Sequence, residues 1–527
     1  MRLHRTSLLA AVLVALLAGG YSERAAAQTP PNVLVVLTDD QRWDTLDFMP
    51  TVQNELAAKG VTFSNAFVVN AVCCPSRASL LTGRWSHSTG VWSVFSPHGI
   101  ERFDDSSTLA TWLDAAGYRT ALLGKYLNGY LTEYVPPGWD DWFGFTLEAR
   151  HYFDYGATEG GAAIPSTALW FGSEPEDYAT DVLADRAEAF VRSAGPEPFF
   201  LYVAPKAPHI DIGQSTTPAP RHAGTFDDLP PYSSPATRER NLSDKPRYVR
   251  KGRAAGVVRL RRTQLESLLA VDELVAGLLA ALDDTGKLAD TLIVFTSDNG
   301  YLWGEHNRTR KIVPYEPSIR VPLVVRWDAG GLTQQTVAQP VLNVDVAPMI
   351  ADAAGIAAPG AKGRSPLPLA RGEQTAWRTR FLFESAIGGG WPVPAYCAFR
   401  GERWKYVQYH TGEEEIYDLR RDPYELRNIR RKQEAMAMRY RERVARSKCR
   451  PPGMRLLEAC TISGTGKSDT LRGTRRPDWI CAGAGRDVID VRRGRADTVD
   501  CGPGRDTVYA EPRDKVAKNC ERVVRST

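Results

Sequence analysis

A short segment with two adjacent cysteines concentrates the groups of this chain that are suited to chemistry. Cys73 and Cys74 are followed at once by Pro75 and Ser76, and Arg77 comes one helical turn after the first cysteine. Proline suits the first turn of a helix, and a helix N-terminus attracts negative charge. The planar guanidinium of arginine binds oxyanions through paired hydrogen bonds. The segment therefore predicts a nucleophile beside a cation, in a site that attacks a tetrahedral anion.

Three continuous apolar runs are predicted to position this segment. They occupy residues 33–37, 199–203 and 292–296. Helical patterns lie between them, at residues 49–59, 108–116, 181–192 and 265–282. Runs of this kind are typical of strands buried on both faces of a largely parallel sheet. In open α/β sheets ligands bind beyond the carboxyl ends of the strands, so we expect the polar residues that end these runs to share one site.

Oxygen-bearing side chains follow two of the runs. Asp39 and Asp40 come after the first run, and Asp298 and Asn299 come after the third. Carboxylate and amide oxygens suit a hard divalent cation and suit zinc poorly. Taken alone, each pair is more typical of a turn or a helix cap. Their common place at strand ends, together with the cysteine segment, favours a metal site.

Residues 71–83 (Ala-Val-Cys-Cys-Pro-Ser-Arg-Ala-Ser-Leu-Leu-Thr-Gly) resemble the first signature of the sulfatase family. The resemblance implies that a formylglycine-generating enzyme oxidises Cys73 to formylglycine, whose hydrate is the nucleophile. Cys74 falls on the variable position of the signature. The alternative from the residues alone is a free cysteine pair in a core, or half of a disulfide, because buried cysteine behaves as a small apolar residue.

The resemblance also implies a ligand set for the metal. The metal is Ca²⁺, with Mg²⁺ as the alternative. Its ligands are Asp39, Asp40, Cys73, Asp298 and Asn299.

The resemblance implies catalytic roles for four further side chains. Residues 117–127 resemble the second family signature, in which Lys125 binds sulfate. His209 resembles the family histidine that assists the leaving group. Lys311 falls where a second sulfate-binding lysine sits, with Arg310 as an alternative. Arg77 is expected to hold the nucleophile and the carboxylates that face the metal.

Two positions depart from the family pattern. Leu127 stands where many arylsulfatases have a histidine that acts at the formylglycine hydroxyl, and Leu302 replaces a second common histidine. Leucine cannot take up a proton, so the role of the first histidine falls to Asn128 or to water. His306 resembles a family histidine after a Gly-Glu pair and is expected at the pocket rim.

The substrate is inferred from three shorter segments, residues 124–128, 135–139 and 142–144. They look like the N-acetylglucosamine-6-sulfatase and heparan-type endosulfatase branch, which implies hydrolysis of a sulfate ester on a sulfated carbohydrate. A broad-range arylsulfatase acting on aryl sulfates is the nearest alternative. A related phosphoesterase would show Thr or Ser as the nucleophile and ligands for two metals. A non-catalytic polysaccharide-binding protein would keep its cysteine unmodified.

The fold that the resemblance implies is α/β and alkaline-phosphatase-like: a large mixed, mostly parallel sheet flanked by helices. A small antiparallel C-terminal subdomain and a β-roll-like repeat tail follow it. With 527 residues the chain is too long for one compact core. We expect a catalytic domain at 28–370, the antiparallel subdomain at 371–450 and the repeat tail at 455–527.

The N-terminus predicts export. Residues 1–5 are basic, 8–17 are apolar and 25–27 are Ala-Ala-Ala, which together form a secretory signal peptide over residues 1–27. The apolar run is shorter than the roughly 20 residues of a membrane span. We expect a secreted or cell-wall-associated protein with no membrane span after signal removal. A net charge of +4 argues neither for nor against nucleic acid. Because no aromatic-interleaved basic patch or nucleic-acid motif stands out, we expect no nucleic-acid partner.

The last third of the chain contains a repeat and most of the cysteines. Aspartates recur at intervals of nine or ten residues, at 469, 478, 487, 497 and 506, each followed two places later by an apolar residue. This pattern resembles the haemolysin-type calcium-binding β-roll, in which successive coils stack; whether this tail binds calcium stays open. Six cysteines outside the Cys73 segment allow fifteen pairings. Cys481 and Cys501 occupy similar repeat positions, so a disulfide between them is expected.

Overall fold

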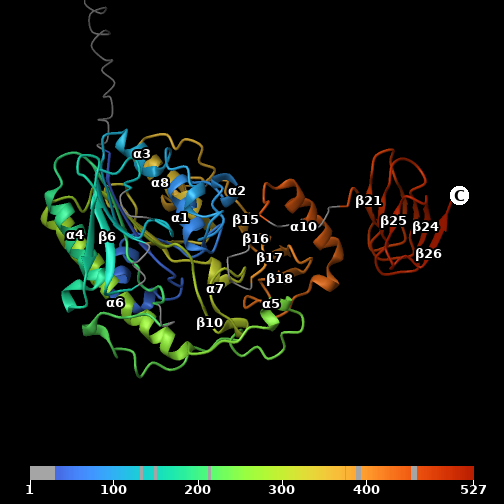
Figure 1. Ribbon diagram of the computed structural model, residues 1–527, viewed down its shortest axis with the longest axis horizontal. Helices are drawn as coiled ribbons and strands as arrows, with labels where there is room; N and C mark the ends of the chain where they lie inside the picture. The colour runs from blue at the N-terminus through green and yellow to red at the C-terminus, as the bar shows by residue number, and fades with distance from the viewer. Residues whose placement is uncertain are drawn as a thin grey trace, which may run out of the picture.

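The computed structural model describes residues 30–130, 134–146, 151–211, 215–373, 376–386, 393–452 and 460–526. The predicted signal peptide, residues 1–27, lies outside this range. A ten-stranded sheet forms the centre, in the order β13-β2-β12-β9-β1-β8-β4-β5-β6-β7 (Figure 1). Its strands are β13 (Gln335–Val337), β2 (Val61–Phe63), β12 (Leu323–Arg326), β9 (Thr291–Ser297), β1 (Asn32–Thr38), β8 (Phe199–Ala204), β4 (Arg119–Gly124), β5 (Asp141–Phe145), β6 (Tyr155–Gly160) and β7 (Thr167–Phe171).

The three predicted strands lie side by side in the middle of this sheet. Strand β1 is parallel to β8 on one side and to β9 on the other, with Val33 opposite both Phe200 and Leu292. Because the three strands run the same way, their carboxyl ends meet at one edge. Strands β12, β6 and β7 run antiparallel to neighbours, so the sheet is mixed. The predicted mixed, mostly parallel α/β sheet is confirmed.

Alternate residues of β1 face two separate apolar cores. Val33 and Val35 pack with residues of α1 (Cys73–Thr82), α3 (Leu109–Asp114) and α8 (Val346–Ala353). Leu34 and Val36 pack with α4 (Ala179–Ser193) and α6 (Val257–Asp284). Figure 1 shows the two groups of helices on opposite sides of the sheet. This two-sided burial explains why the central strands are apolar at every position.

Three of the four predicted helices form with shifted ends, and the fourth changes type. Residues 49–59 contain a π-helical segment, Val52–Ala57, and a 3₁₀ turn, Leu46–Phe48, precedes them. The backbone N–H groups of Thr51 and Val52 donate to Asp272 of α6, each at 2.9 Å, so a side chain distant in sequence caps this segment.

The remaining short helices are α2 (Ser86–Thr89), α5 (Arg247–Arg250), α7 (Glu316–Ile319), α9 (Leu367–Ala370) and 3₁₀ turns at Ile100–Arg102, Pro175–Asp177, Pro220–His222, Glu305–Asn307, Asn343–Asp345 and Arg430–Lys432.

A small antiparallel sheet follows the large one. It consists of β15 (Arg380–Ser385), β16 (Tyr396–Gly401), β17 (Trp404–Tyr409) and β18 (Glu414–Asp418). Helix α10 (Glu434–Arg446) packs on one of its faces, and the Cys397–Cys449 disulfide joins β16 to the chain just after that helix. Two-stranded pairs elsewhere are β10 (Leu302–Trp303) with β11 (Thr309–Arg310) and β3 (Ala66–Phe67) with β14 (Val341–Leu342).

The repeat tail forms two parallel sheets made from alternating short strands. One contains β19 (Ile462–Ser463), β21 (Trp479–Cys481), β23 (Thr498–Asp500) and β25 (Lys515–Val516). The other contains β20 (Thr470–Arg472), β22 (Val488–Asp490), β24 (Thr507–Ala510) and β26 (Arg522–Arg525). The repeated aspartates link the coils: Asp487 accepts the N–H of Asp469 at 2.8 Å, and Asp497 that of Asp478 at 2.7 Å. Each coil therefore spans two nine-residue repeats.

The expected Cys481–Cys501 disulfide is wrong. The structure pairs Cys460 with Cys481 and Cys501 with Cys520. In the sheet register Cys481 lies opposite Asp500, not Cys501, and successive strand residues point to opposite faces. Cys501 consequently faces the interior of the tail, whereas Cys481 packs beside Met438 of α10.

Candidate active site

The carboxyl ends of β1 and β9 place two acidic pairs in contact. Thr38 and Ser297 are aligned across these parallel strands, so the residues that follow them meet. The backbone N–H of Asp40 donates to Oδ1 of Asp298 at 3.1 Å, and Nδ2 of Asn299 donates to Oδ1 of Asp40 at 2.6 Å. Asp40 has a φ of 71°, a left-handed conformation that is costly for a residue with a Cβ and is typical of functional sites.

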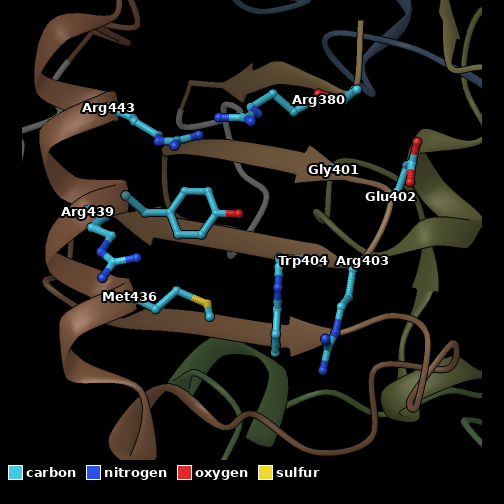
Figure 2. A pocket seen from close by; sticks show the side chains of 10 residues that line it. Arg380, Gly401, Glu402, Arg403, Trp404, Met436, Arg439 and Arg443 are labelled. Carbon is cyan, nitrogen blue, oxygen red and sulfur yellow. The ribbon is translucent and has the colours of Figure 1, made fainter.

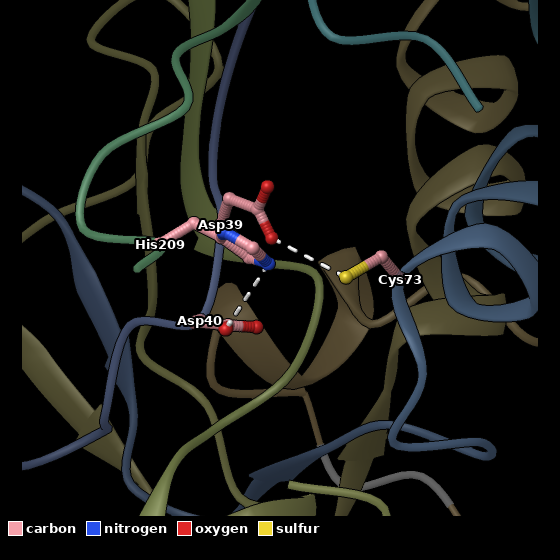
Figure 3. A group of neighbouring side chains, drawn as sticks. All are labelled: Asp39, Asp40, Cys73 and His209. Atoms are coloured by element: carbon pink, nitrogen blue, oxygen red, sulfur yellow. Dashed lines mark hydrogen bonds and ion pairs between the residues drawn. The ribbon is translucent and has the colours of Figure 1, made fainter. Parts of the chain in front are cut away.

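The cysteine segment reaches this edge from the other side. Helix α1 begins at Cys73 and buries its whole length. The Cys73 thiol lies 3.4 Å from Oδ1 of Asp39, and Nζ of Lys311 lies 2.6 Å from its sulfur. Figure 3 shows Cys73 pointing at Asp39, with His209 above Asp40. Cys74 points elsewhere, toward the backbone carbonyl of Asn128 at 3.8 Å.

Three cations surround the carboxylates. Lys125, directly after β4, contacts Asp39, and Lys311 contacts Asp40. Arg77 is fully buried; its Nε donates to Oδ2 of Asp298 at 2.7 Å and its Nη1 to the backbone carbonyl of Lys125 at 2.6 Å. The guanidinium therefore joins the end of β9 to the end of β4 through the first turn of α1.

The loop that carries the second lysine has a strained backbone on both sides of that residue. Arg310 and Ile312, on either side of Lys311, have φ values of 79° and 80°. Positive φ at two non-glycine residues costs of the order of 1–3 kcal/mol each and persists only where packing enforces it. Lys311 is the residue that reaches Cys73 and Asp40, so the structure places Lys311 rather than Arg310 in the cluster.

Burial and charge together set the protonation of the cluster. Burial raises the pKa of Asp40 and of Asp298. Burial opposes ionisation of Asp39 as well, but the positive charges around it, led by Lys125, hold its pKa well below the usual range. Burial, with the charge of Asp39, raises the pKa of the Cys73 thiol. Burial therefore favours the neutral thiol at Cys73, while the surrounding cations keep Asp39 ionised.

His209 lies at the open side of the cluster. Its Nδ1 is 2.6 Å from the carbonyl oxygen of Ile210, which makes Nδ1 the protonated nitrogen, and its Nε2 is 3.7 Å from Oδ2 of Asp40. Burial lowers its pKa to about 3. The side chain is 29% exposed, compared with 1% for Asp40, so an approaching ligand meets the imidazole first.

The donor set fits a divalent metal ion. Four potential ligand atoms, from Asp39, Asp40, Cys73 and His209, lie within 4.8 Å of one another. Oδ2 of Asp40 and Oδ1 of Asn299 are buried and have no hydrogen-bond partner in the described part of the chain. Unpaired buried oxygens are costly unless a cation or another donor satisfies them. Hard oxygen donors of this kind suit Ca²⁺ or Mg²⁺.

One residue that supports the site was not identified from the sequence. Asn343 donates through Nδ2 to the carbonyl oxygen of Ser76 at 3.1 Å, and its Oδ1 accepts the N–H of Val69 at 3.1 Å. It thereby fixes the loop before α1 to the first turn of that helix. The local sequence carries no sign of this contact, because 267 residues separate Asn343 from Ser76.

The expected rim position of His306 is wrong. The residue is buried, its Nδ1 lies 2.6 Å from Oε2 of Glu239, and its ring packs on Tyr315 with 4.2 Å between centroids. Leu127 and Leu302, which replace family histidines, are both buried in the main apolar core. The role of Asn128 or water in place of the first histidine stays a prediction.

Comparison with known proteins identifies the family. The profile described as Sulfatase matches residues 31–356, and the profile described as N-sulphoglucosamine sulphohydrolase, C-terminal, matches residues 304–448. An arylsulfatase of Volvox carteri is 31% identical over 487 residues, covering 78% of this chain and 73% of the relative. The human N-acetylglucosamine-6-sulfatase is 33% identical over 412 residues, covering 72% of each chain.

A solved structure has the same fold. It is described as a complex with its substrate D-glucosamine-2-N,6-O-disulfate, and it superposes with a TM-score of 0.67 at 26% identity, covering 80% of this chain and 98% of its own. Fold, site and sequence agree on a hydrolase that acts on anionic esters. The chain belongs to the sulfatase family and is a sulfuric ester hydrolase. Membership implies a divalent metal and a formylglycine nucleophile.

Proposed function

We propose that this enzyme removes sulfate from a sulfated sugar, specifically the 6-sulfate of N-acetylglucosamine units. The support is its similarity to N-acetylglucosamine-6-sulfatases and to the protein solved with a sulfated glucosamine. A broad-range arylsulfatase is the second candidate, favoured by the similarity to the Volvox carteri enzyme.

We also propose that the protein is exported through the signal peptide at 1–27. Its proposed domains are 28–370, 371–450 and 455–527. Within the described part of the chain, every helix is too short or too polar to cross a bilayer.

One observation carries the catalytic assignment: Cys73, at the start of α1, lies between Lys311 and Asp39. Once it is converted to formylglycine, position 73 supplies a hydrated aldehyde as the nucleophile. Lys125 and Lys311 orient the sulfate oxygens and offset the charge that develops on them. Arg77 holds Asp298 and the backbone of Lys125 in place.

His209 is proposed to act at the leaving oxygen. Its ring is held by the Ile210 carbonyl on the Nδ1 side, so Nε2 is directed into the site and toward the open side. In the neutral ring Nε2 carries no proton, so protonation of the departing alcohol requires the imidazolium form, which the negative charge of a bound sulfate ester favours.

The nucleophile assignment is tested with protein from a host that makes formylglycine. Mass spectrometry of the tryptic peptide ending at Arg77 is expected to show the aldehyde at position 73. Cys73→Ala is expected to abolish sulfate release from 4-nitrocatechol sulfate and glucosamine 6-sulfate, whereas Cys74→Ala retains activity. Unconverted cysteine, or equal losses in the two variants, would contradict the assignment. The ratio of kcat/KM on the two substrates separates sugar sulfatase from arylsulfatase.

Calcium is the proposed metal, held by Asp39, Asp40, Asp298 and Asn299, with residue 73 completing the set. Oxygen-rich sites with several carboxylates favour Ca²⁺, whereas Mg²⁺ demands stricter octahedral geometry. We expect EDTA to lower both activity and the melting temperature, and Ca²⁺ to restore both better than Mg²⁺. Full recovery with Mg²⁺ alone would assign the site to magnesium.

A further inference from the structure

A cavity of about 340 Å³ lies between helix α10 and the small antiparallel sheet, and its lining contains no residue of the Cys73 cluster. The face of β15 and β16 beside it is the one covered by α10: Leu382 and Phe399 pack toward that helix, whereas Phe381 and Phe383 pack into the main core. Figure 2 shows arginines entering this space from the helix and from the strands.

Four arginines from three elements line the cavity. Arg380 comes from β15, Arg403 from the β16–β17 turn, and Arg439 and Arg443 from α10. Arg403 is paired with Asp418 at 2.8 Å. The other three form no ion pair with any described residue. Glu402, a carboxylate of the lining, is already paired with Arg420 at 3.3 Å.

Clustered cations without acidic partners repel one another, and an anion bound between them removes that repulsion. The guanidinium group matches the oxygens of a sulfate or carboxylate through paired hydrogen bonds. The three unpaired arginines are exposed, so an incoming anion reaches them without displacing part of the protein. The cavity therefore has the charge of an anion-binding site.

Apolar surface separates the arginines. Trp404 and Tyr440 are half-buried in the cavity, and Tyr440 is held by a stacked contact with Tyr406 at 5.1 Å between centroids. The Arg403 guanidinium lies 4.5 Å from the Trp404 ring. Rigid aromatic rings offer flat apolar surface at low entropic cost. Such rings among arginines suit a ligand with both apolar C–H faces and anionic groups, which is the chemistry of a sulfated sugar chain.

We propose that this cavity binds a sulfated polysaccharide, as a second site separate from the catalytic cluster, and that it retains the enzyme on polymeric substrate. The proposal rests on the proposed function, because a sulfated polymer is the anion that such an enzyme meets. The charge of the whole chain is only +4, so a strong polyanion affinity requires a local cluster of this kind.

The test measures binding without turnover. A heparin octasaccharide is titrated calorimetrically into full-length Cys73→Ala protein at 0.15 M salt, with and without Arg439→Glu plus Arg443→Glu. The matched control is Arg493→Glu plus Arg495→Glu, two exposed tail arginines without an ion pair in the described residues, which changes the net charge equally. We expect an affinity loss of about tenfold or more in the cavity variant only. Arg380→Ser, on the strand side, is expected to weaken binding independently.

Unchanged affinity in the cavity variants, an equal loss in the tail control, or equal competition by a DNA duplex would each overturn the proposal. In converted enzyme with Cys73 intact, the cavity variant is expected to keep its turnover of 4-nitrocatechol sulfate and to lose kcat/KM on polymer. Failure of the converted enzyme to hydrolyse any sulfate ester would refute the proposed function, while the octasaccharide titration would still decide the binding site.

Discussion

At the scale of single residues, the site is a buried arrangement of opposite charges. Asp39, Asp40 and Asp298 are buried against Lys125, Lys311 and Arg77. Charges in such an interior are tolerated only when each has partners, and removing one partner is far more costly than at the surface. Arg77 has the most demanding geometry, because two of its nitrogens bind groups that follow the ends of two different strands, β9 and β4.

Arg77→Lys is expected to lower sulfate release by at least about 100-fold, since a lysine cannot reach Asp298 and the Lys125 carbonyl together, and small displacements in a site are costly. The free energy of unfolding is expected to fall by about 3 kcal/mol. Urea denaturation and turnover of 4-nitrocatechol sulfate measure the two effects. Arg84→Lys, just beyond the same helix where Arg84 bonds the Gly360 carbonyl, is the control and should change stability by less than about 0.5 kcal/mol. Near-wild-type turnover of the Arg77 variant would contradict the positioning role.

At the scale of elements, the sequence pattern predicted the central strands correctly, because their formation depends on residues close together in the chain. The strands at 33–37, 199–203 and 292–296 are buried on both faces of the sheet. Because side chains on either face are then apolar, each strand is an uninterrupted apolar run in the sequence. The segment at 49–59 differs because its caps come from Asp272, a residue more than 200 positions away. The Cys481–Cys501 pairing failed for a similar reason: the register of the tail sheet, which is set by coil stacking, decides which cysteines share a face.

At the scale of the whole molecule, the disulfide bonds of the described residues lie near the C-terminal end. The three disulfides of the described chain lie in the last third, around the small sheet and the tail, while Cys73 and Cys74 remain free. The catalytic cluster depends instead on packing of the large sheet against its helices. One face of the small sheet packs into the main core through Phe381 and Phe383, whereas α10 covers the other, so loss of the Cys397–Cys449 bond is expected to loosen α10 first.

Replacing Cys397 and Cys449 by serine is expected to lower the stability of the small sheet with α10 by about 4 kcal/mol, because the bond closes a loop of 52 residues. Hydrogen exchange should accelerate in residues 434–446, and octasaccharide affinity should fall. Turnover of 4-nitrocatechol sulfate at 25 °C should stay within about twofold of the parent enzyme, since α10 can open locally while the other face of the small sheet stays packed in the main core. A parallel loss of turnover would show that the two regions unfold as one unit.

The sequence by itself determined the nucleophile segment, the apolar strands and the acidic residues at their ends, because each depends on neighbours in the chain. Only the tertiary structure decided how these parts meet. It brought Lys311 rather than Arg310 to Cys73, buried His306 away from the site, and supplied Asn343 from a distant segment. It also gathered Arg380, Arg439 and Arg443 around one cavity. Contacts of this kind depend on strand register and helix packing, which are set by the burial of the whole core and leave no local pattern.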